Sequence, residues 1–146
     1  MVSSSTCAIF NVEYSNQVVD LKEGGQADGT PVVGYVFNRV GTNLHQRWYV
    51  EVLKTDAEGN ITVHLTNNGN GNYLRVETAL LNQGLEGSHF SMKWLLVKQG
   101  DSGKYFIKVP DTNFTCVLPN NHNYTQIKLA VLDESDPKQM WMFQEV

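Results

Sequence analysis

The sequence predicts an all-β domain built from three similar units, and two observations lead to this fold class. First, tryptophan occurs only as Trp48, Trp94 and Trp141, at almost equal intervals and each time in an apolar stretch. Second, short apolar or alternating segments separated by turn residues fill the chain, and no stretch has a convincing helical period. A regular internal repeat of this kind constrains the architecture more strongly than local propensities do.

The first unit, approximately residues 1–53, is expected to contain four strands. Ala8, Phe10 and Val12 alternate with their neighbours, which predicts a strand with one buried face. The next three strands are expected at residues 18–21, 31–37 and 46–53. Polar loops rich in glycine or asparagine, at residues 22–29 and 38–44, separate them.

The second and third units, approximately residues 54–99 and 100–146, repeat this order of strands. In the second unit a strict alternation at residues 61–65 precedes an asparagine-rich turn at residues 67–72. The other strands of that unit are expected at residues 73–76, 84–90 and 92–97, the middle one having the weakest pattern. Those of the third unit are expected at residues 105–109, 114–118, 126–132 and 139–144.

Threefold repetition of a four-stranded unit favours one particular all-β architecture. A single unit cannot bury its own apolar face, whereas three units related by rotation can close six strands into a barrel and cap one end with three hairpins. The sequence therefore predicts a single β-trefoil domain over residues 1–146. Each tryptophan is then expected to pack the interior of the barrel.

Charge and composition argue against several classes of partner. The net charge is −4 and the 11 Lys and Arg residues are scattered, so nucleic acid is not an expected partner. No apolar run is long enough to span a bilayer, so membrane insertion is not expected. The first residues have neither a basic nor an apolar region, which predicts a cytoplasmic protein without a signal peptide.

Cysteine and histidine spacing predicts neither a metal site nor a disulfide framework. Cys7 and Cys116 are expected to be reduced, packed thiols, because one cysteine pair in a chain of this size is a thin framework. The four histidines lack the spacing of metal ligands. Neither a nucleophile motif nor a phosphate-binding glycine loop is present, and no cofactor is expected.

A glutamine lies two residues before the tryptophan in the first and third units, as Gln46 before Trp48 and Gln139 before Trp141. With the segments at residues 11–14, 19–21 and 33–38, this pattern resembles the ricin B-like (R-type) β-trefoil lectins of mushrooms, over the whole chain. The resemblance implies a fungal carbohydrate-binding lectin for galactose, N-acetylgalactosamine or lactose. Its partners would be β-galactoside glycans on glycoproteins or glycolipids.

The resemblance also assigns roles to residues of the first unit. Asp20 matches the carboxylate that accepts hydrogen bonds from two sugar hydroxyls, and Asn38 matches a loop amide. Gln46 would support the floor of the pocket. The sugar-contacting positions fall on Tyr35 and His45, although strand alternation could turn Tyr35 away and present Val36 or Phe37 instead. Each residue also has a structural alternative, such as a solvated strand end for Asp20 and a turn for His45.

Comparison of the three units predicts one working site per chain. Arg75 and Val117 occupy the position of Asp20 in the second and third units, and neither can accept two hydroxyl hydrogen bonds. Met92 also replaces the glutamine in the second unit. A chain with one site cannot cross-link cells, so agglutination would require a homodimer. The resemblance implies such a dimer and a role in defence.

Two functions of other classes remain as alternatives. Mushroom β-trefoils include protease inhibitors that act through an exposed loop, for which the segments Lys22 to Thr30 and Gly41 to Leu44 are candidates. A glycosidase would need a second carboxylate facing Asp20, and Glu23 or Asp28 could supply it. We expect a protein that is not an enzyme, because no carboxylate pair is evident from the sequence.

Overall fold

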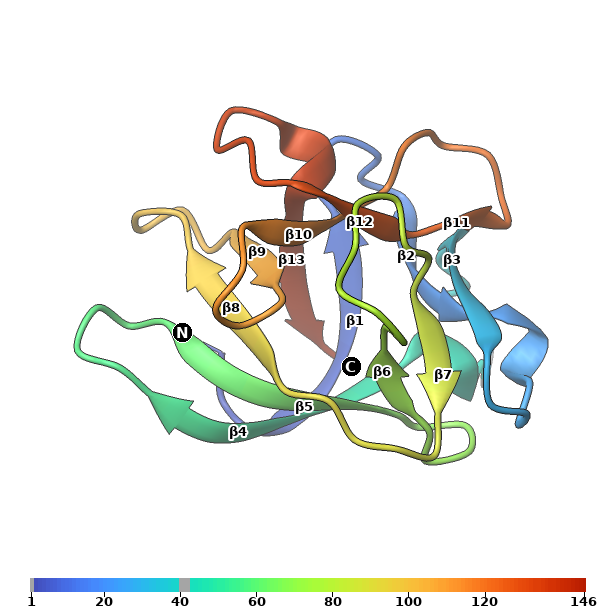
Figure 1. Ribbon diagram of the computed structural model, residues 1–146. Helices are drawn as coiled ribbons and strands as arrows, with labels where there is room; N and C mark the ends of the chain where they lie inside the picture. The colour runs from blue at the N-terminus through green and yellow to red at the C-terminus, as the bar shows by residue number, and fades with distance from the viewer. Residues whose placement is uncertain (1, 40–42) are drawn as a thin grey trace.

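The computed structural model describes residues 2–39 and 43–146, and this part of the chain forms thirteen short strands with three single-turn 3-10 helices (Figure 1). No long helix is present in it. In chain order the elements are β1 (Ser5–Asn11), β2 (Gln17–Leu21), η1 (Lys22–Gly24), β3 (Thr30–Val36), η2 (Leu44–Gln46), β4 (Trp48–Thr55), β5 (Ile61–Asn67), β6 (Tyr73–Arg75), β7 (Glu86–Ser88), β8 (Trp94–Lys98), β9 (Tyr105–Lys108), β10 (Phe114–Val117), β11 (Thr125–Gln126), β12 (Lys128–Val131), η3 (Pro137–Gln139) and β13 (Met140–Glu145).

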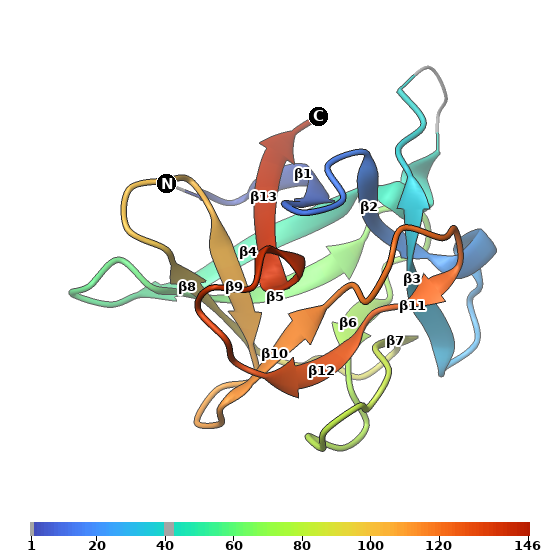
Figure 2. The ribbon, with the colours of Figure 1, turned by 90° about the horizontal axis from the view of Figure 1, so that it is seen from above.

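Six strands close into a barrel. β4, β8 and β13 contain the tryptophans, and β1, β5 and β9 are their partners. Antiparallel pairing runs from β1 to β4, β5, β8, β9 and β13, and then back to β1. Each unit contributes two neighbouring members of this ring, whose arrangement can be followed in Figures 1 and 2. Because the ring closes, no barrel strand is left with an unpaired edge. The prediction of a β-trefoil is confirmed.

The remaining strands form one hairpin per unit. They are β2 with β3, β6 with β7, and β10 with β12. The first hairpin also pairs with the other two units, because β3 pairs with β7 at Thr30 and Pro31 and with β11 at Val33 and Gly34. The strand predicted at residues 126–132 is therefore divided: β11 joins the hairpin of the first unit, and β12 stays in its own.

The three tryptophans are fully buried, and each makes the same hydrogen bond. Their indole N–H groups donate to the backbone carbonyls of Val19, Leu74 and Cys116 at 2.9, 2.9 and 3.1 Å. Each of these carbonyls lies in the first strand of a hairpin, so the bond joins barrel to hairpin in every unit. The residues that follow the three carbonyls are Asp20, Arg75 and Val117, which are thereby placed at equivalent positions.

One expectation for the first strand is wrong. β1 was expected to bury a single face, but all residues from Cys7 to Asn11 are buried. Cys7 and Ile9 belong to the barrel core, whereas Ala8 and Phe10 form a second cluster with Val18. Phe37 packs against this second cluster, with its ring 5.1 Å from that of Phe10. The outer face of β1 is covered because the chain after β3 folds over it.

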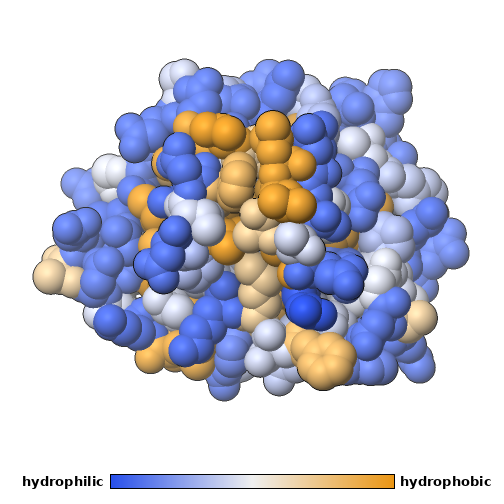
Figure 3. Space-filling view, in the orientation of Figure 1, coloured by the Kyte–Doolittle hydropathy of each residue, from blue (hydrophilic) through white to orange (hydrophobic). Residues whose placement is uncertain are grey.

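Both cysteines are free and buried, as predicted. Burial raises the pKa of each thiol, so both are protonated at neutral pH. Figure 3 shows that the face seen in Figure 1 is mostly hydrophilic, with apolar side chains gathered near its upper centre. Within the described ranges, no helix has the length and apolar character needed to cross a membrane.

Candidate functional site

The side chains expected to bind sugar lie around the first hairpin and the turn η2. Asp20 is near the end of β2, Tyr35 is on β3, and His45 and Gln46 are on η2. β2 and β3 are in a register that pairs Val18 with Tyr35. A hollow of about 210 Å³ opens there, and the described residues that line it are Asp20, Glu23, Tyr35, Asn43, His45 and Tyr124.

Asp20 lies at the floor of this hollow and is only 2% exposed. One carboxylate oxygen, Oδ1, is 3.0 Å from His45 Nδ1, and the other, Oδ2, accepts a hydrogen bond from Gln46 Nε2 at 2.9 Å. Because a carboxylate only accepts, His45 Nδ1 carries the proton of the first bond. Burial raises the pKa of Asp20 above its usual value of 3.8, against the lowering effect of these two hydrogen bonds.

Gln46 is fully buried beneath the hollow and uses both ends of its amide. Besides Asp20, Nε2 donates to the Val36 carbonyl at 3.0 Å, and Oε1 accepts from the Asn38 backbone N–H at 2.9 Å. These bonds hold the end of β3 against η2 and fix the amide that donates to Asp20. The structure therefore places Gln46 behind the carboxylate, where it has no surface for contact with a ligand.

The ring of Tyr35 lines the hollow and is half-buried. Of the two alternatives to Tyr35, Val36 is exposed outside the lining, and Phe37 packs against Phe10. Asn38 is exposed and is not among the lining residues; the amide side chain found there is that of Asn43. Four of the five predicted residues thus meet at one place, and Asn38 contributes its backbone N–H.

The sequence did not predict Asn43 and Tyr124 as lining residues, and it suggested Glu23 only as the second carboxylate of a glycosidase. Tyr124 belongs to the third unit, and its ring lies 5.1 Å from that of Tyr35 at an angle of 63°. No local pattern indicates this contact, because it depends on how β11 pairs with β3. Glu23 is on η1 with a positive φ of 54°, a conformation set by its turn.

An asparagine-rich turn of the second unit supports the site from behind. Asn67 Nδ2 donates to the His45 carbonyl at 3.0 Å. Asn70 Nδ2 donates to the Gly25 carbonyl at 2.9 Å and to the Gly24 carbonyl at 3.2 Å. Asn72 Nδ2 donates to the Gln26 carbonyl at 3.1 Å. Both η1 and η2 are consequently attached to the second unit through side-chain amides.

These contacts also bear on the two alternative functions. The segment from Lys22 to Thr30, one candidate inhibitory loop, is tied down by Asn70 and Asn72. The other, Gly41 to Leu44, falls partly outside the described residues. Of the two carboxylates considered as glycosidase partners, Glu23 lines the hollow with Asp20, whereas Asp28 lies in a different hollow.

The equivalent position in the second unit has the opposite charge. Arg75 lines a hollow of about 290 Å³ with Asp28, Glu77, Glu86 and Phe90, and its guanidinium lies 5.6 Å from the Phe90 ring. Partial burial and the nearby Glu77 raise the pKa of Glu86. In the third unit Val117 is buried and apolar. Neither position offers a carboxylate held by an amide and an imidazole.

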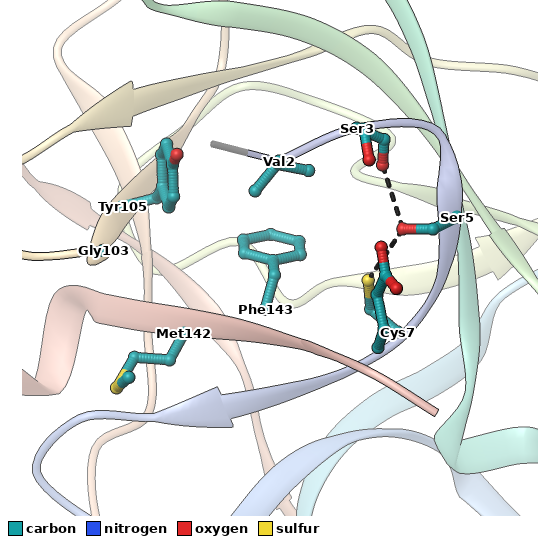
Figure 4. Close-up of a pocket in the computed structure, with 9 residues that line it drawn as sticks. Val2, Ser3, Ser5, Cys7, Gly103, Tyr105, Met142 and Phe143 are labelled. Atoms are coloured by element: carbon teal, nitrogen blue, oxygen red, sulfur yellow. Dashed lines mark hydrogen bonds between the residues drawn. The ribbon is translucent and has the colours of Figure 1, made fainter.

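A further hollow, of about 270 Å³, opens beside the N-terminal segment (Figure 4). Val2, Tyr105 and Phe143 form its apolar side, and the Ser5 hydroxyl lies 3.5 Å from Cys7 Sγ. Burial raises the pKa of the Cys7 thiol, so this thiol is protonated at neutral pH and is not an activated nucleophile. Across the described ranges, no group of three or more His, Cys, Asp or Glu side chains is placed to hold a metal ion.

No family model matches the sequence. The structure is similar to the Rhizoctonia solani agglutinin, with a TM-score of 0.83 and 25% identity, covering 100% of this chain and 98% of that one. It is similar to the Macrolepiota procera ricin B-like lectin in complex with lactose, with a TM-score of 0.81, 24% identity and coverage of 100% and 99%. A designed threefold-symmetric protein, ThreeFoil, gives a TM-score of 0.80 and 17% identity, with coverage of 97% and 99%.

These structural neighbours confirm the resemblance that the sequence predicted. The chain has the fold of the ricin B-like lectins along its full length, and the similarity supports a carbohydrate-binding lectin.

Proposed function

We propose that the protein is a lectin that binds terminal galactose or N-acetylgalactosamine through one shallow site, the hollow around Asp20. The observation that carries the proposal is the carboxylate of Asp20, buried at the floor of the hollow and held by His45 and Gln46. Two tyrosine rings stand beside it. A fixed anion next to aromatic surface is the combination that a galactose ring requires, with its two neighbouring hydroxyls and one apolar face.

The carboxylate of Asp20 can accept more hydrogen bonds than the two that it receives from the protein. A carboxylate has about four lone-pair positions, and His45 and Gln46 occupy one on each oxygen. The others can accept the third and fourth hydroxyls of galactose, as charge-assisted hydrogen bonds. An epimer that offers only one of these hydroxyls in the right direction leaves a buried acceptor unpaired, and that penalty is the source of specificity.

The same contacts support a proposal of binding without hydrolysis. A glycosidase uses one carboxyl group as a proton donor to the leaving oxygen. Asp20 instead accepts an N–H hydrogen bond on each oxygen, and these bonds lower its pKa, although burial raises it by more. We therefore assign Asp20 a binding role and propose no enzymatic activity.

Isothermal titration with lactose and with an N-acetylgalactosaminide tests the site directly. We expect a stoichiometry of one per chain and a dissociation constant on the order of millimolar, as for one shallow monosaccharide site. Asp20→Ala should abolish binding, while Arg75→Ala, the matched change in the second unit, should leave it unchanged. A stoichiometry of two or three, or full binding by Asp20→Ala, would overturn the assignment to the first unit.

The same proposal includes the oligomeric state, the location and the biological role of the protein. Cross-linking of glycoproteins or glycolipids by a chain with one site requires at least two chains, so we propose a homodimer. Light scattering at micromolar concentration, together with agglutination of cells bearing β-galactosides, tests it. A monomer that agglutinates cells would show that the chain has more than one site. We propose a cytoplasmic location and a defence role on the grounds given from the sequence.

A further inference from the structure

One wall of the hollow around Asp20 comes from the third unit, in the form of Tyr124. We infer that Tyr124 is a sugar-contacting residue of this site, so that the site is shared between the first and third units. The inference rests on the proposed galactoside-binding function and adds to it an aromatic residue that selects the ligand. Neither the glutamine and tryptophan pattern nor the carboxylate position indicates it.

Backbone pairing brings Tyr124 to the hollow. β11 pairs with β3, with Thr125 opposite Gly34, and the Tyr124 N–H donates to the Gly34 carbonyl at 3.0 Å. A Cβ at Gly34 would lie 2.6 Å from Leu118 Cδ1, so glycine at this position lets the Leu118 side chain of the third unit pack closely against β3. Figures 1 and 2 both show β11 beside β3, at the side of the molecule where η1 lies.

Side chains of both units hold the residue before Tyr124 in place. Asn123 Oδ1 accepts hydrogen bonds from Gln17 Nε2 at 3.1 Å and from the Val36 N–H at 3.0 Å. Gln17 is buried, and its Nε2 also donates to the Asn121 carbonyl at 3.0 Å. The loop that carries Tyr124 is therefore attached to β2 and β3 before any ligand arrives, and little ordering is needed on binding.

The ring of Tyr124 presents an accessible surface at the edge of the hollow. The residue is 46% exposed, and its ring meets that of Tyr35 edge to face at 5.1 Å. Lys22 Nζ lies 5.4 Å from the ring centroid, so the ammonium group adds a second contact that restrains the ring. An exposed aromatic ring held from two sides, next to a buried carboxylate, suits the apolar face of a sugar whose hydroxyls point to Asp20.

The backbone of Tyr124 provides an additional argument. Its φ is +70°, in the left-handed region that non-glycine residues rarely adopt. Hydrogen bonds of the neighbouring residues hold the tyrosine in this conformation, which raises its backbone energy. Residues with such strained backbones are concentrated at ligand-binding positions. Replacement by glycine removes the ring and relieves the backbone at the same time, which separates the role of the ring from that of the loop.

Titration of lactose into four proteins tests the inference: the wild type, Tyr124→Ala, Tyr124→Gly and Tyr124→Phe. Loss of the ring should weaken binding about tenfold in the alanine and glycine variants, the size of one good aromatic contact. The phenylalanine variant, which keeps the ring, should remain within about twofold of the wild type. Tyr49→Ala is the matched control, because Tyr49 is similarly exposed on β4 and does not line the hollow.

The same titrations separate this inference from the proposed function. If the wild type binds lactose, Asp20→Ala does not, and Tyr124→Gly binds like the wild type, the site stands and the role of Tyr124 is overturned. If the wild type binds no galactoside at all, the proposed function itself is overturned. Thermal unfolding of each variant shows whether it is folded, and the glycine variant is expected to be at least as stable as the alanine variant.

Discussion

In the first and third units, the glutamine before the tryptophan makes the same two backbone hydrogen bonds, but the neighbouring residue on the hairpin differs. Gln46 and Gln139 both donate to the carbonyl at the end of the preceding strand, Val36 or Val131, at 3.0 Å. Both accept a backbone N–H two residues further along, at 2.9 and 2.8 Å. The glutamine therefore has a structural role in both units. Only in the first unit does the same amide also reach a carboxylate, Asp20, where the third unit has Val117.

The second unit lacks this glutamine and makes a different contact from the same position. Met92 stands at the glutamine position, and its Sδ accepts the Val76 N–H at 3.4 Å. The indole of Trp94 still donates to the Leu74 carbonyl. The comparison teaches that the tryptophan bond is common to all three units, the amide to two, and the held carboxylate to one. The following predictions test this order, from the largest expected effect to the smallest.

Val117→Asp gives the third unit the residue of the first, and we expect it to destabilise the protein without creating a second site. Val117 is buried, and the structure places no imidazole beside it as His45 lies beside Asp20. A buried charge without a partner costs about 3 to 5 kcal/mol. Urea denaturation measures the loss, and lactose titration measures the stoichiometry. A stoichiometry of two would show that a carboxylate at this position, with Gln139 but without an imidazole, is sufficient.

Gln46→Ala and Gln139→Ala form a matched pair that separates folding from binding. Each removes a buried amide that serves two backbone groups, so each should lower the free energy of unfolding by about 1 to 3 kcal/mol. Only Gln46→Ala should also weaken lactose binding, by about tenfold, since it removes one donor to Asp20. Equal binding by the two variants would contradict the second role of Gln46.

Galactoside binding should be lost on acidification at a pH above the usual pKa of aspartate. Burial raises the pKa of Asp20, and binding needs its anion, so affinity should fall about tenfold per pH unit below that raised value. Protonation of Asp20 favours the folded state, because its pKa there is higher than in the unfolded chain. The loss of binding therefore does not reflect unfolding at this group. Titrations from pH 7 to pH 4 measure it.

A second carboxyl group, that of Glu23, lines the same hollow, and a control is needed to assign the pH effect to Asp20. Glu23→Gln keeps Asp20 and His45 in place, so its profile should retain the same midpoint. A midpoint that disappears with Glu23→Gln would assign the titration to Glu23 instead.

Asn70→Ala should have the smallest effect. Its side chain joins the turn of the second unit to the carbonyls of Gly24 and Gly25, next to Glu23. Loss of partly exposed hydrogen bonds costs about 0.5 to 1.5 kcal/mol. We expect a lower melting temperature and a loss of lactose affinity of about twofold, because η1 is less firmly held. An unchanged melting temperature would show that this brace does not contribute to stability.

The fold could be predicted from the sequence because each unit carries its own periodic signal. The three tryptophans give the repeat, and alternation along the chain places the strands. The main local error, the second buried face of β1, arises because Ala8 and Phe10 are covered by Phe37. Alternation reports which residues share a face, but not whether another segment packs on the opposite one.

The candidate site was predictable only in part, for a related reason. Asp20, Tyr35, His45 and Gln46 belong to one unit, and the resemblance to the ricin B-like lectins assigned a role to each of them. Tyr124 reaches the hollow because β11 pairs with β3, and the asparagine turn braces η1 and η2 through side-chain amides. Contacts between units leave no period in either segment, and a single sequence does not reveal them.

Closure of the barrel by its first and last strands has a consequence for synthesis. β1 obtains one of its two barrel partners only from β13, at residues 140–145. During translation β1 cannot complete its pairing until β13 has been synthesised, and pairing between strands so distant in sequence forms slowly. The hollow around Asp20 also needs Tyr124 from the third unit. The proposed sugar site is thus complete only after the third unit has been synthesised, because a nascent chain that ends with its second unit lacks the part of the wall that Tyr124 forms.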